Sequence, residues 1–579
     1  MENNAYIASR LEGTDYSGND TALFRNEVKK KQDESYVVNT RLANGSIVGE
    51  SLIKRDDGAT VESRIVLGVY AVGRYLGQIE IPQQDFETKL MQYLPLEFRP
   101  TVGGNSKAYI ADSIRAQADK MKQLTIYQHT GWRIIDGTVA FLHNGGAIGK
   151  EGVTVELEGK SSQFMFTTDS HNDRWETFKK YLSVAPHAVT YPLLAISALS
   201  PLNEFLRKAR CEPSFLLFLL GRTGSGKSTL AALTLCFFGE FGNKGLPASS
   251  KDTVNALEKM GFLTKDILTV IDDFRPSTSQ SERSRLAYTT QELCRAYGDR
   301  TGKNRMNADG SMRASYPPRG NAILTGEDIP VIGESGEARF LTVEVIKSEV
   351  NMQLVQDVDS KHIHLNECMR DYITWLIPLY ERLPDTLNKR FLELRTKAQS
   401  GGHGRIAESI AHLQLAIEVW CLFMRSADLI SETEATDMKE EAWVIFRDLA
   451  DKNNKALIAE KPSVQFLSAL RELLLTGKVK LFPTDTSLMG SEGIGWKDGN
   501  YAYLNWGTAY NAVCKYYRER DGVFPLGTNQ LLKHLAAEHY IVSDKDNNSK
   551  LKKLGGKTRR VVWLHIDALD EKDEQKEEK

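Results

Sequence analysis

The chain has 579 residues, of which 41% are hydrophobic and 26% charged, as expected for a globular protein of several domains. Its formal net charge of −2 excludes a chain that is basic throughout, so any nucleic-acid surface must come from local clusters. Six scattered cysteines without a CxxC pair argue against a disulfide framework and a cysteine zinc site. We expect no signal peptide, no membrane span and a cytoplasmic location.

Residues 1–165 predict a mixed α+β N-terminal domain. The stretches 36–40 and 64–70 alternate or are rich in β-branched residues, which indicates strands, whereas 107–123 has the spacing of a helix. A strand–turn–strand follows over 131–142. No catalytic constellation is present, which favours an oligomerisation or substrate-guiding role.

Residues 166–354 predict an α/β domain. Helical stretches over 172–210 precede an apolar run at 215–220, and a second apolar run lies at 267–271. Continuous apolar strands that alternate with helices indicate a parallel sheet covered on both faces.

A GxxxxGK[ST] motif runs from Gly221 to Ser228, between the first apolar strand and a helix. Its glycines allow a tight turn that aims backbone N–H groups at phosphate oxygens. Lys227 is expected to reach the β- and γ-phosphates of ATP and Ser228 to hold Mg²⁺. The predicted cofactor-binding residues are Gly221, Arg222, Thr223, Gly224, Ser225, Gly226, Lys227, Ser228 and Thr229.

Two carboxylates, Asp272 and Asp273, end the second apolar strand, where a Walker-B pair belongs. The first is predicted to orient the metal and the second to polarise the attacking water. The alternative is a solvated acidic turn.

Beyond these motifs, the order of elements over about residues 30–460 resembles AAA+ ring ATPases. It is most similar to the superfamily III and MCM-like helicases of bacterial mobile elements and phages, including a family known only as a domain of unknown function. The resemblance is carried by a Gly-Trp turn at 127–133, a basic hairpin at 302–310, a sensor strand at 321–327 and an arginine-finger turn at 337–341. Thr325 occupies the sensor position, where many AAA+ proteins have Asn.

The resemblance implies a homo-oligomeric ring, a hexamer, with single-stranded DNA in its channel. Arg339 would then enter the neighbouring subunit's nucleotide site; the alternative is a surface salt bridge. The hairpin residues Lys303 and Arg305 would grip the DNA backbone. The alternative for the hairpin is a solvated polar loop.

The rest of the chain predicts a helical lid over 355–460, a winged helix over 461–566 and a disordered charged tail over 567–579. Arg405 is a candidate second sensor in the lid. In the winged helix, Thr528 is a candidate N-cap, the segment from Tyr540 to Val542 reads as a strand and the residues after it as a polar loop. The predicted DNA contacts there are Lys552, Lys553, Lys557 and Arg559. A winged helix that contacts protein is the alternative.

These patterns favour an ATP-dependent DNA helicase that replicates a mobile element or phage, with priming by a separate protein. The alternatives are a nucleotide-switched DNA-binding assembly protein that unwinds nothing, and a P-loop NTPase that does not act on DNA.

Overall fold

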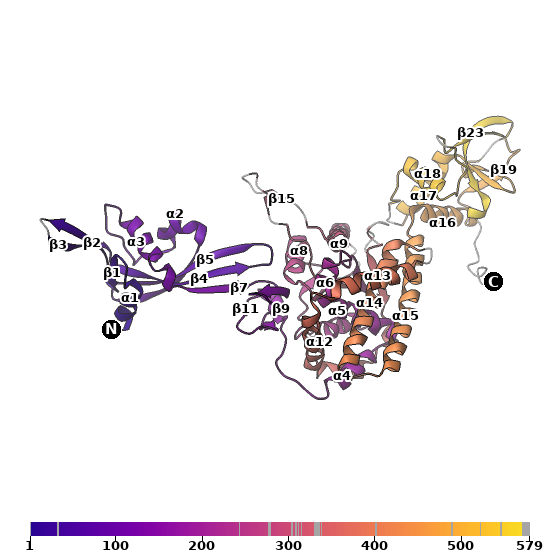
Figure 1. Cartoon of the computed structure of the whole chain (residues 1–579). Helices are drawn as coiled ribbons and strands as arrows, with labels where there is room; N and C mark the ends of the chain where they lie inside the picture. The colour runs from indigo at the N-terminus through magenta and orange to yellow at the C-terminus, as the bar shows by residue number, and fades with distance from the viewer. Residues whose placement is uncertain are drawn as a thin grey trace. The chain divides into compact units, whose positions relative to one another are not determined.

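The structure is a computed structural model (Figure 1). It describes residues 2–31, 34–242, 244–275, 279–302, 305–306, 310, 312–313, 315–328, 336, 338–399, 402–487, 490–520, 523–544 and 547–569. The chain divides into two compact units, one comprising most of residues 1–447 and the other most of residues 448–579. The finer domain boundaries expected from the sequence stay predictions.

The N-terminal part of the first unit is built on two sheets. An antiparallel sheet contains β1 (Tyr16–Asn19), β2 (Ala22–Lys31) and β3 (Glu34–Ala43). A five-stranded sheet has the order β11-β7-β4-β5-β6, with bounds Thr154–Val155, Lys122–Tyr127, Gly45–Asp56, Val61–Ala71 and Arg74–Pro82. Helices α1 (Glu2–Leu11), α2 (Gln83–Tyr93) and α3 (Ser106–Arg115) bury apolar side chains against these strands.

The helix predicted over 107–123 is wrong in its second half. Helix α3 ends at Arg115, and β7 begins at Lys122. Residues 122–127 pair in parallel with β4, and Ile126 and Tyr127 are buried there. The sheet ladder supplies backbone partners to this segment, so tertiary pairing overrides the helical spacing.

A hairpin of β8 (Gly131–Ile135) and β9 (Thr138–His143) follows, and β10 (Gly146–Ile148) extends it. Asp136 and Gly137 form its two-residue turn, with φ of 48° and 77°. Two positive φ values in succession are what a twisted two-residue hairpin turn requires. This is the strand–turn–strand expected from the sequence.

The central sheet has five strands in the order β13-β14-β17-β12-β18, and every neighbouring pair is parallel. Their bounds, in that order, are Ala248–Ser249, Leu268–Phe274, Asn321–Gly326, Leu216–Leu220 and Phe340–Glu344. Helix α7 (Lys227–Leu235) packs on β14 and β17, and α9 (Gln280–Asp299) contacts β12. Because the strands are parallel, the loops that follow β12, β14 and β17 meet at one edge of the sheet.

Helices precede and follow this sheet. The segment 172–210 contains α4 (Arg174–Leu182), α5 (His187–Leu199) and α6 (Asn203–Lys208). After the sheet come α11 (Met352–Asp359), α12 (Ile363–Leu376), α13 (Leu383–Ala398), α14 (Gly404–Ser426) and α15 (Glu432–Ala459), in orange tones in Figure 1. In the described part of the chain, α14 alone is long and apolar enough to cross a membrane, but 83% of its apolar window is buried.

The second unit combines three helices with a five-stranded sheet (Figure 1). The helices are α16 (Pro462–Leu475), α17 (Trp506–Arg518) and α18 (Thr528–Ala537). The sheet order is β19-β20-β21-β23-β22, with bounds Lys480–Pro483, Gly493–Lys497, Tyr501–Leu504, Lys557–His565 and Lys550–Leu554. One sheet face contributes Ile494, Ala502 and Val562 to the core shared with the helices.

Three local predictions in this unit are corrected. The N-cap of α18 is Gly527, whereas Thr528 is the first helical residue and accepts a hydrogen bond from Trp506 Nε1 at 2.7 Å. The strand predicted after Tyr540 is reduced to one bridge between Ile541 and Leu564. The predicted polar loop contains β22, because residues 550–554 pair with β23.

Candidate functional site

The loop after β12 needs glycine at three positions. Gly224 and Gly226 have φ of 76° and 93°, in the left-handed region that favours glycine. At Gly221, a Cβ atom would lie 2.6 Å from the carbonyl oxygen of Val345 and 2.6 Å from Ser225 Oγ. Helix α7 begins immediately after Gly226, so the unpaired N–H groups of its first turn adjoin the loop. The loop therefore has the construction of an anion cradle.

Lys227 lies inside this loop. Its side chain is largely buried, with the whole residue 9% exposed, and Nζ donates to the carbonyl oxygen of Arg222 at 3.4 Å. The Ser225 hydroxyl is buried and has no hydrogen-bond partner among the described residues. A buried ammonium beside an unsatisfied hydroxyl leaves donors available for phosphate oxygens.

Three predicted residues meet beside the loop. Ser228 Oγ donates to Asp272 Oδ1 at 2.8 Å, and the Thr325 hydroxyl donates to the same carboxylate oxygen. They converge because β14 and β17 are adjacent, with α7 packed on both. A hydroxyl and a carboxylate at this separation are oxygen ligands of the kind that Mg²⁺ prefers, and Mg²⁺ keeps most of its waters. Ser228 and Asp272 therefore have the chemistry expected of the predicted metal ligands.

Asp273 lies at an irregularity where β14 leaves its register with β17. Its φ is 74°, and its N–H donates to Thr325 Oγ1 at 3.3 Å. The carboxylate forms an ion pair with Arg275. A non-glycine residue with positive φ is strained, and such strain gathers at functional sites.

A cavity of about 160 Å³ occupies this edge of the sheet. It is lined by Thr223, Gly224, Gly226, Lys227, Ser228, Thr229, Asp273, Phe274, Arg275, Thr325, Gly326 and Glu327. Small-molecule pockets usually measure about 300–1,000 Å³. This one therefore has room for the phosphate portion of a nucleotide.

Two charged residues of this cavity, Arg275 and Glu327, were missed at the sequence level. Arg275 Nε lies 3.9 Å from Glu327 Oε1, and Glu327 also accepts a hydrogen bond from the Thr223 hydroxyl. Each residue directly follows a strand of the parallel sheet. Position after a strand end was the signal that could have found them, because such residues line the ligand crevice.

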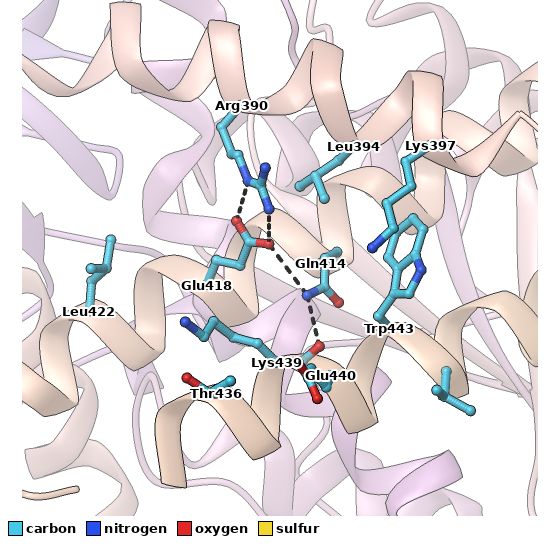
Figure 2. A pocket seen from close by; sticks show the side chains of 11 residues that line it. Arg390, Leu394, Lys397, Gln414, Glu418, Leu422, Thr436, Lys439, Glu440 and Trp443 are labelled. Carbon is cyan, nitrogen blue, oxygen red and sulfur yellow. Dashed lines mark hydrogen bonds and ion pairs between the residues drawn. The ribbon is translucent and has the colours of Figure 1, made fainter. Parts of the chain in front are cut away.

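A larger cavity, of about 580 Å³, lies between α13, α14 and α15 (Figure 2). Its polar side chains contact one another: Arg390 donates to both oxygens of Glu418, at 2.7 and 2.8 Å. The Lys397 ammonium lies 4.4 Å from the ring centroid of Trp443. None of the predicted site residues lines this cavity, so its size alone does not make it the functional site.

Arg339 lies at the opposite edge of the sheet from the phosphate loop. It immediately precedes β18, whose first residue, Phe340, pairs with Leu216 at the beginning of β12. Its guanidinium donates to both carboxylate oxygens of Asp299, at 2.8 and 3.0 Å, and the residue is 8% exposed. The ion pair considered as an alternative is thus present, and it is more buried than a surface pair. Entry into a neighbouring subunit stays a prediction.

The Gly-Trp turn joins the N-terminal sheets to the central sheet. Gly131 has φ of 88°, and a Cβ atom there would lie 2.5 Å from the carbonyl oxygen of Lys265. Trp132 is 2% exposed and donates from Nε1 to the carbonyl oxygen of Pro201 at 2.7 Å. Burial, together with the nearby Arg319 guanidinium, lowers the pKa of His129 to about 3. This turn is therefore a packed structural joint.

Of the two DNA contacts predicted in the central domain, the structure describes the backbone of one. Lys303 lies outside the described residues. Arg305 belongs to β15 (Arg305–Met306), which pairs antiparallel with β16 (Met312–Arg313). The backbone therefore forms the expected hairpin, whereas its contact with DNA stays a prediction.

The four predicted DNA contacts on β22 and β23 divide into two groups. Lys552 Nζ lies 4.8 Å from the ring centroid of Tyr503, and the Arg559 guanidinium lies 5.0 Å from that of Trp496. These two side chains cover aromatic rings on the sheet face that lacks the helices. Lys553 and Lys557 are exposed. The exposed pair is the better placed to contact phosphate.

Comparison with known proteins gives a fold relationship. Residues 85–316 match a family described as "Domain of unknown function (DUF927)". No curated protein matches the chain. A solved structure described as "SCCmec type IV Cch - active helicase" is similar with a TM-score of 0.60 and 15% identity, over 96% of this chain and 99% of that one. A structure of "JCV Helicase" with a bound small molecule has a TM-score of 0.18 and 16% identity, over 47% and 72% of the two chains, and supports no argument. The chain therefore shares its fold along nearly its whole length with a protein described as an active helicase.

Proposed function

We propose that this protein is an ATP-dependent DNA helicase that serves the replication of a mobile element or phage. The observation that carries the proposal is the meeting of Ser228, Asp272 and Thr325 beside a glycine-rich loop that contains a buried lysine. The whole-chain likeness in fold to a described helicase supports the choice of a DNA motor over other ATPases.

The AAA+ assignment is supported by the order of the central sheet. The strand with the phosphate loop, β12, lies between β17 and β18, and the Walker-B strand β14 lies beyond β17. This order places a sensor strand between the two nucleotide-binding strands. A polar side chain on it, Thr325, can then contact the Walker-B carboxylate, as it does here.

Within this proposal each residue has one task. The backbone of the loop and Lys227 bind the phosphates of ATP. Ser228 and Asp272 hold Mg²⁺, which would neutralise charge on the β- and γ-phosphates. Asp273 is the predicted base for the attacking water, and Arg339 the predicted trans arginine of a hexameric ring; its role requires the pair with Asp299 to open.

DNA binding is assigned to two places. The β15–β16 hairpin would contact single-stranded DNA in the channel through Lys303 and Arg305. The second unit has the helix–helix–hairpin order of a winged helix, and its exposed Lys553 and Lys557 would contact duplex phosphates. A separate primase would supply primers.

The proposal is tested by measuring ATP hydrolysis with and without single-stranded DNA, together with the mass in solution and strand displacement on a fork. We expect hydrolysis to rise with DNA, a ring-sized mass and displacement of the strand. DNA-stimulated hydrolysis without displacement would favour the nucleotide-switched assembly protein. If the rate of ATP hydrolysis did not change with DNA and the chain formed no ring, the proposal of a DNA motor would be refuted.

A further inference from the structure

Two carboxylates, Asp273 and Glu327, line the nucleotide cavity, and either could in principle activate water. The sequence motif points to Asp273, because it is the second acid of the Walker-B pair. The structure assigns this task to Glu327: we propose that its carboxylate positions and deprotonates the water that attacks the terminal phosphate. The assignment rests on the proposed hydrolysis of ATP at this site.

The first argument is where the terminal phosphate would lie. The lysine of a phosphate loop reaches the β- and γ-phosphates. Lys227 Nζ lies 3.4 Å from the carbonyl oxygen of Arg222, so the ammonium adjoins the first half of the loop. Thr223 follows directly, and its hydroxyl donates to Glu327. Glu327 therefore contacts the part of the loop that the terminal phosphate would occupy.

The second argument is that the proposed metal ligand Asp272 and the proposed base Glu327 belong to the ends of two different strands, β14 and β17. Ser228 lines the cavity and donates to Asp272, and Thr325 holds the Asp272 carboxylate. Glu327 is two residues beyond Thr325 on the same segment. Its N–H donates to the carbonyl oxygen of Phe274 at 3.0 Å, which fixes its backbone to the end of β14. A carboxylate fixed at the ends of β14 and β17 could hold water at the phosphate while Ser228 and Asp272 hold the metal.

The third argument concerns Asp273 itself. Its carboxylate forms an ion pair with Arg275, whose side chain is 65% exposed, and its backbone has the strained φ of 74°. The same Arg275 Nε lies 3.9 Å from Glu327 Oε1, so Arg275 engages the Asp273 carboxylate more closely than that of Glu327. Glutamate also reaches one methylene further than aspartate from the edge of the sheet.

The step balances without a further reactant. The oxygen of the water forms a bond to the terminal phosphorus, while the bond from that phosphorus to the bridging oxygen of ADP breaks. One proton of the water passes to the Glu327 carboxylate and then to solvent. Lys227 contacts the phosphate oxygens as the charge shifts toward ADP.

The test compares Glu327→Gln with Asp273→Asn in the full chain. Gln keeps an oxygen that accepts from Thr223, so the loop contact survives and only the basic carboxylate is lost. Asp328→Asn is the matched control, because Asp328 is the next residue, is exposed and does not line the cavity. Binding of a fluorescent ATP analogue with Mg²⁺ and single-turnover hydrolysis are measured for each.

We expect Glu327→Gln to bind nucleotide within about twofold of the unaltered chain and to lose hydrolysis by about 10²–10⁴. Asp273→Asn should keep at least ten times the rate of Glu327→Gln, and Asp328→Asn should match the unaltered chain. Hydrolysis by Glu327→Gln within threefold of the unaltered rate would overturn the assignment and leave the proposed function intact. An unaltered chain that does not hydrolyse ATP would overturn both.

Discussion

The pair of Arg339 and Asp299 gives the most decisive single experiment, because the two roles considered for Arg339 predict different results. The Arg339 side chain is 10% exposed, and the Asp299 side chain is 38% exposed. Truncation to Ala loses charge-assisted hydrogen bonds worth about 1.5–3 kcal/mol and part of a buried three-methylene stem at about 0.8 kcal/mol per methylene. Because Asp299 is partly solvated, we expect a net loss of about 2–4 kcal/mol.

That loss should lower the unfolding temperature of the first unit by roughly 2–4 °C, because an unfolding entropy of about 2.1 cal/mol/K per residue in a unit of more than 400 residues gives about 1 °C per kcal/mol. Asp299→Ala should lower it in the same direction, because a largely buried guanidinium then lacks its carboxylate. Arg339→Met keeps the apolar stem, so it should cost less than Arg339→Ala. Calorimetry of the three variants measures these shifts.

The reasoning would be refuted by an Arg339→Ala chain with an unchanged unfolding temperature and no hydrolysis. If mixing that chain with an Asp272→Asn chain then restored turnover, Arg339 would act in the neighbouring subunit. Arg339→Ala chains that unfold early and hydrolyse ATP in proportion to their folded fraction would support the structural ion pair with Asp299 as the role of Arg339.

Three further predictions address other parts of the chain. Gly131→Ala should lower the unfolding temperature, since φ of 88° costs an L-residue about 1–2 kcal/mol before the clash with the Lys265 carbonyl is counted; differential scanning calorimetry checks this. The pKa of His129 is about 3 when folded and near 6.5 when unfolded, so the unfolded chain binds the extra proton between these values. Stability should therefore fall by about 2 kcal/mol from pH 7 to 5, and a His129→Gln chain should show a shallower fall in denaturant titrations. Lys553→Ala should weaken duplex binding and reduce its salt slope by about 1 in fluorescence anisotropy, whereas Lys552→Ala, which uncovers aromatic rings, should mainly destabilise the second unit.

The phosphate loop and its strand could be predicted because the information is local. Gly221, Gly224 and Gly226 stand at fixed spacing, and the structure gives each a steric or conformational reason. The strand β14 could be predicted equally well, since a continuous apolar run in a parallel sheet has few other interpretations. Motifs whose parts are adjacent in sequence need no knowledge of the fold.

Glu327 and Arg275 could not be found in that way. Each directly follows a strand, but the sequence does not show that β14 and β17 are neighbours in the sheet, which is what brings the two residues together. The error over residues 107–123 has the same origin, because the pairing of β7 with β4 is a long-range contact. The strand β22 was predicted as a loop because its lysines have low β-propensity. Its backbone pairing with β23 offsets that low propensity.

The strand β17 links the cavity beside the glycine-rich loop to the hairpin proposed to contact DNA. All six of its residues are buried, and the Thr325 hydroxyl near its end donates to the Asp272 carboxylate. At its beginning, Arg300 donates to Asn321 Oδ1 at 3.0 Å and to the carbonyl oxygen of Gly320 at 2.6 Å. Arg300 stands directly before the segment that contains β15 and β16. Arg319, two residues before the strand, donates to the carbonyl oxygen of Asp57 in the N-terminal part at 2.8 Å.

A strand held at both ends and packed on all sides responds to a force as a rigid element, because close-packed interiors deform little. A shift of Asp272 and Thr325 on loss of the terminal phosphate would therefore move Asn321 and, through it, Arg300. The base of the hairpin would follow, while the bond from Arg319 to Asp57 would carry the same movement to the N-terminal sheets. Arg300, whose side chain is 11% exposed, thus joins the segment before the hairpin to β17, the strand that carries Thr325.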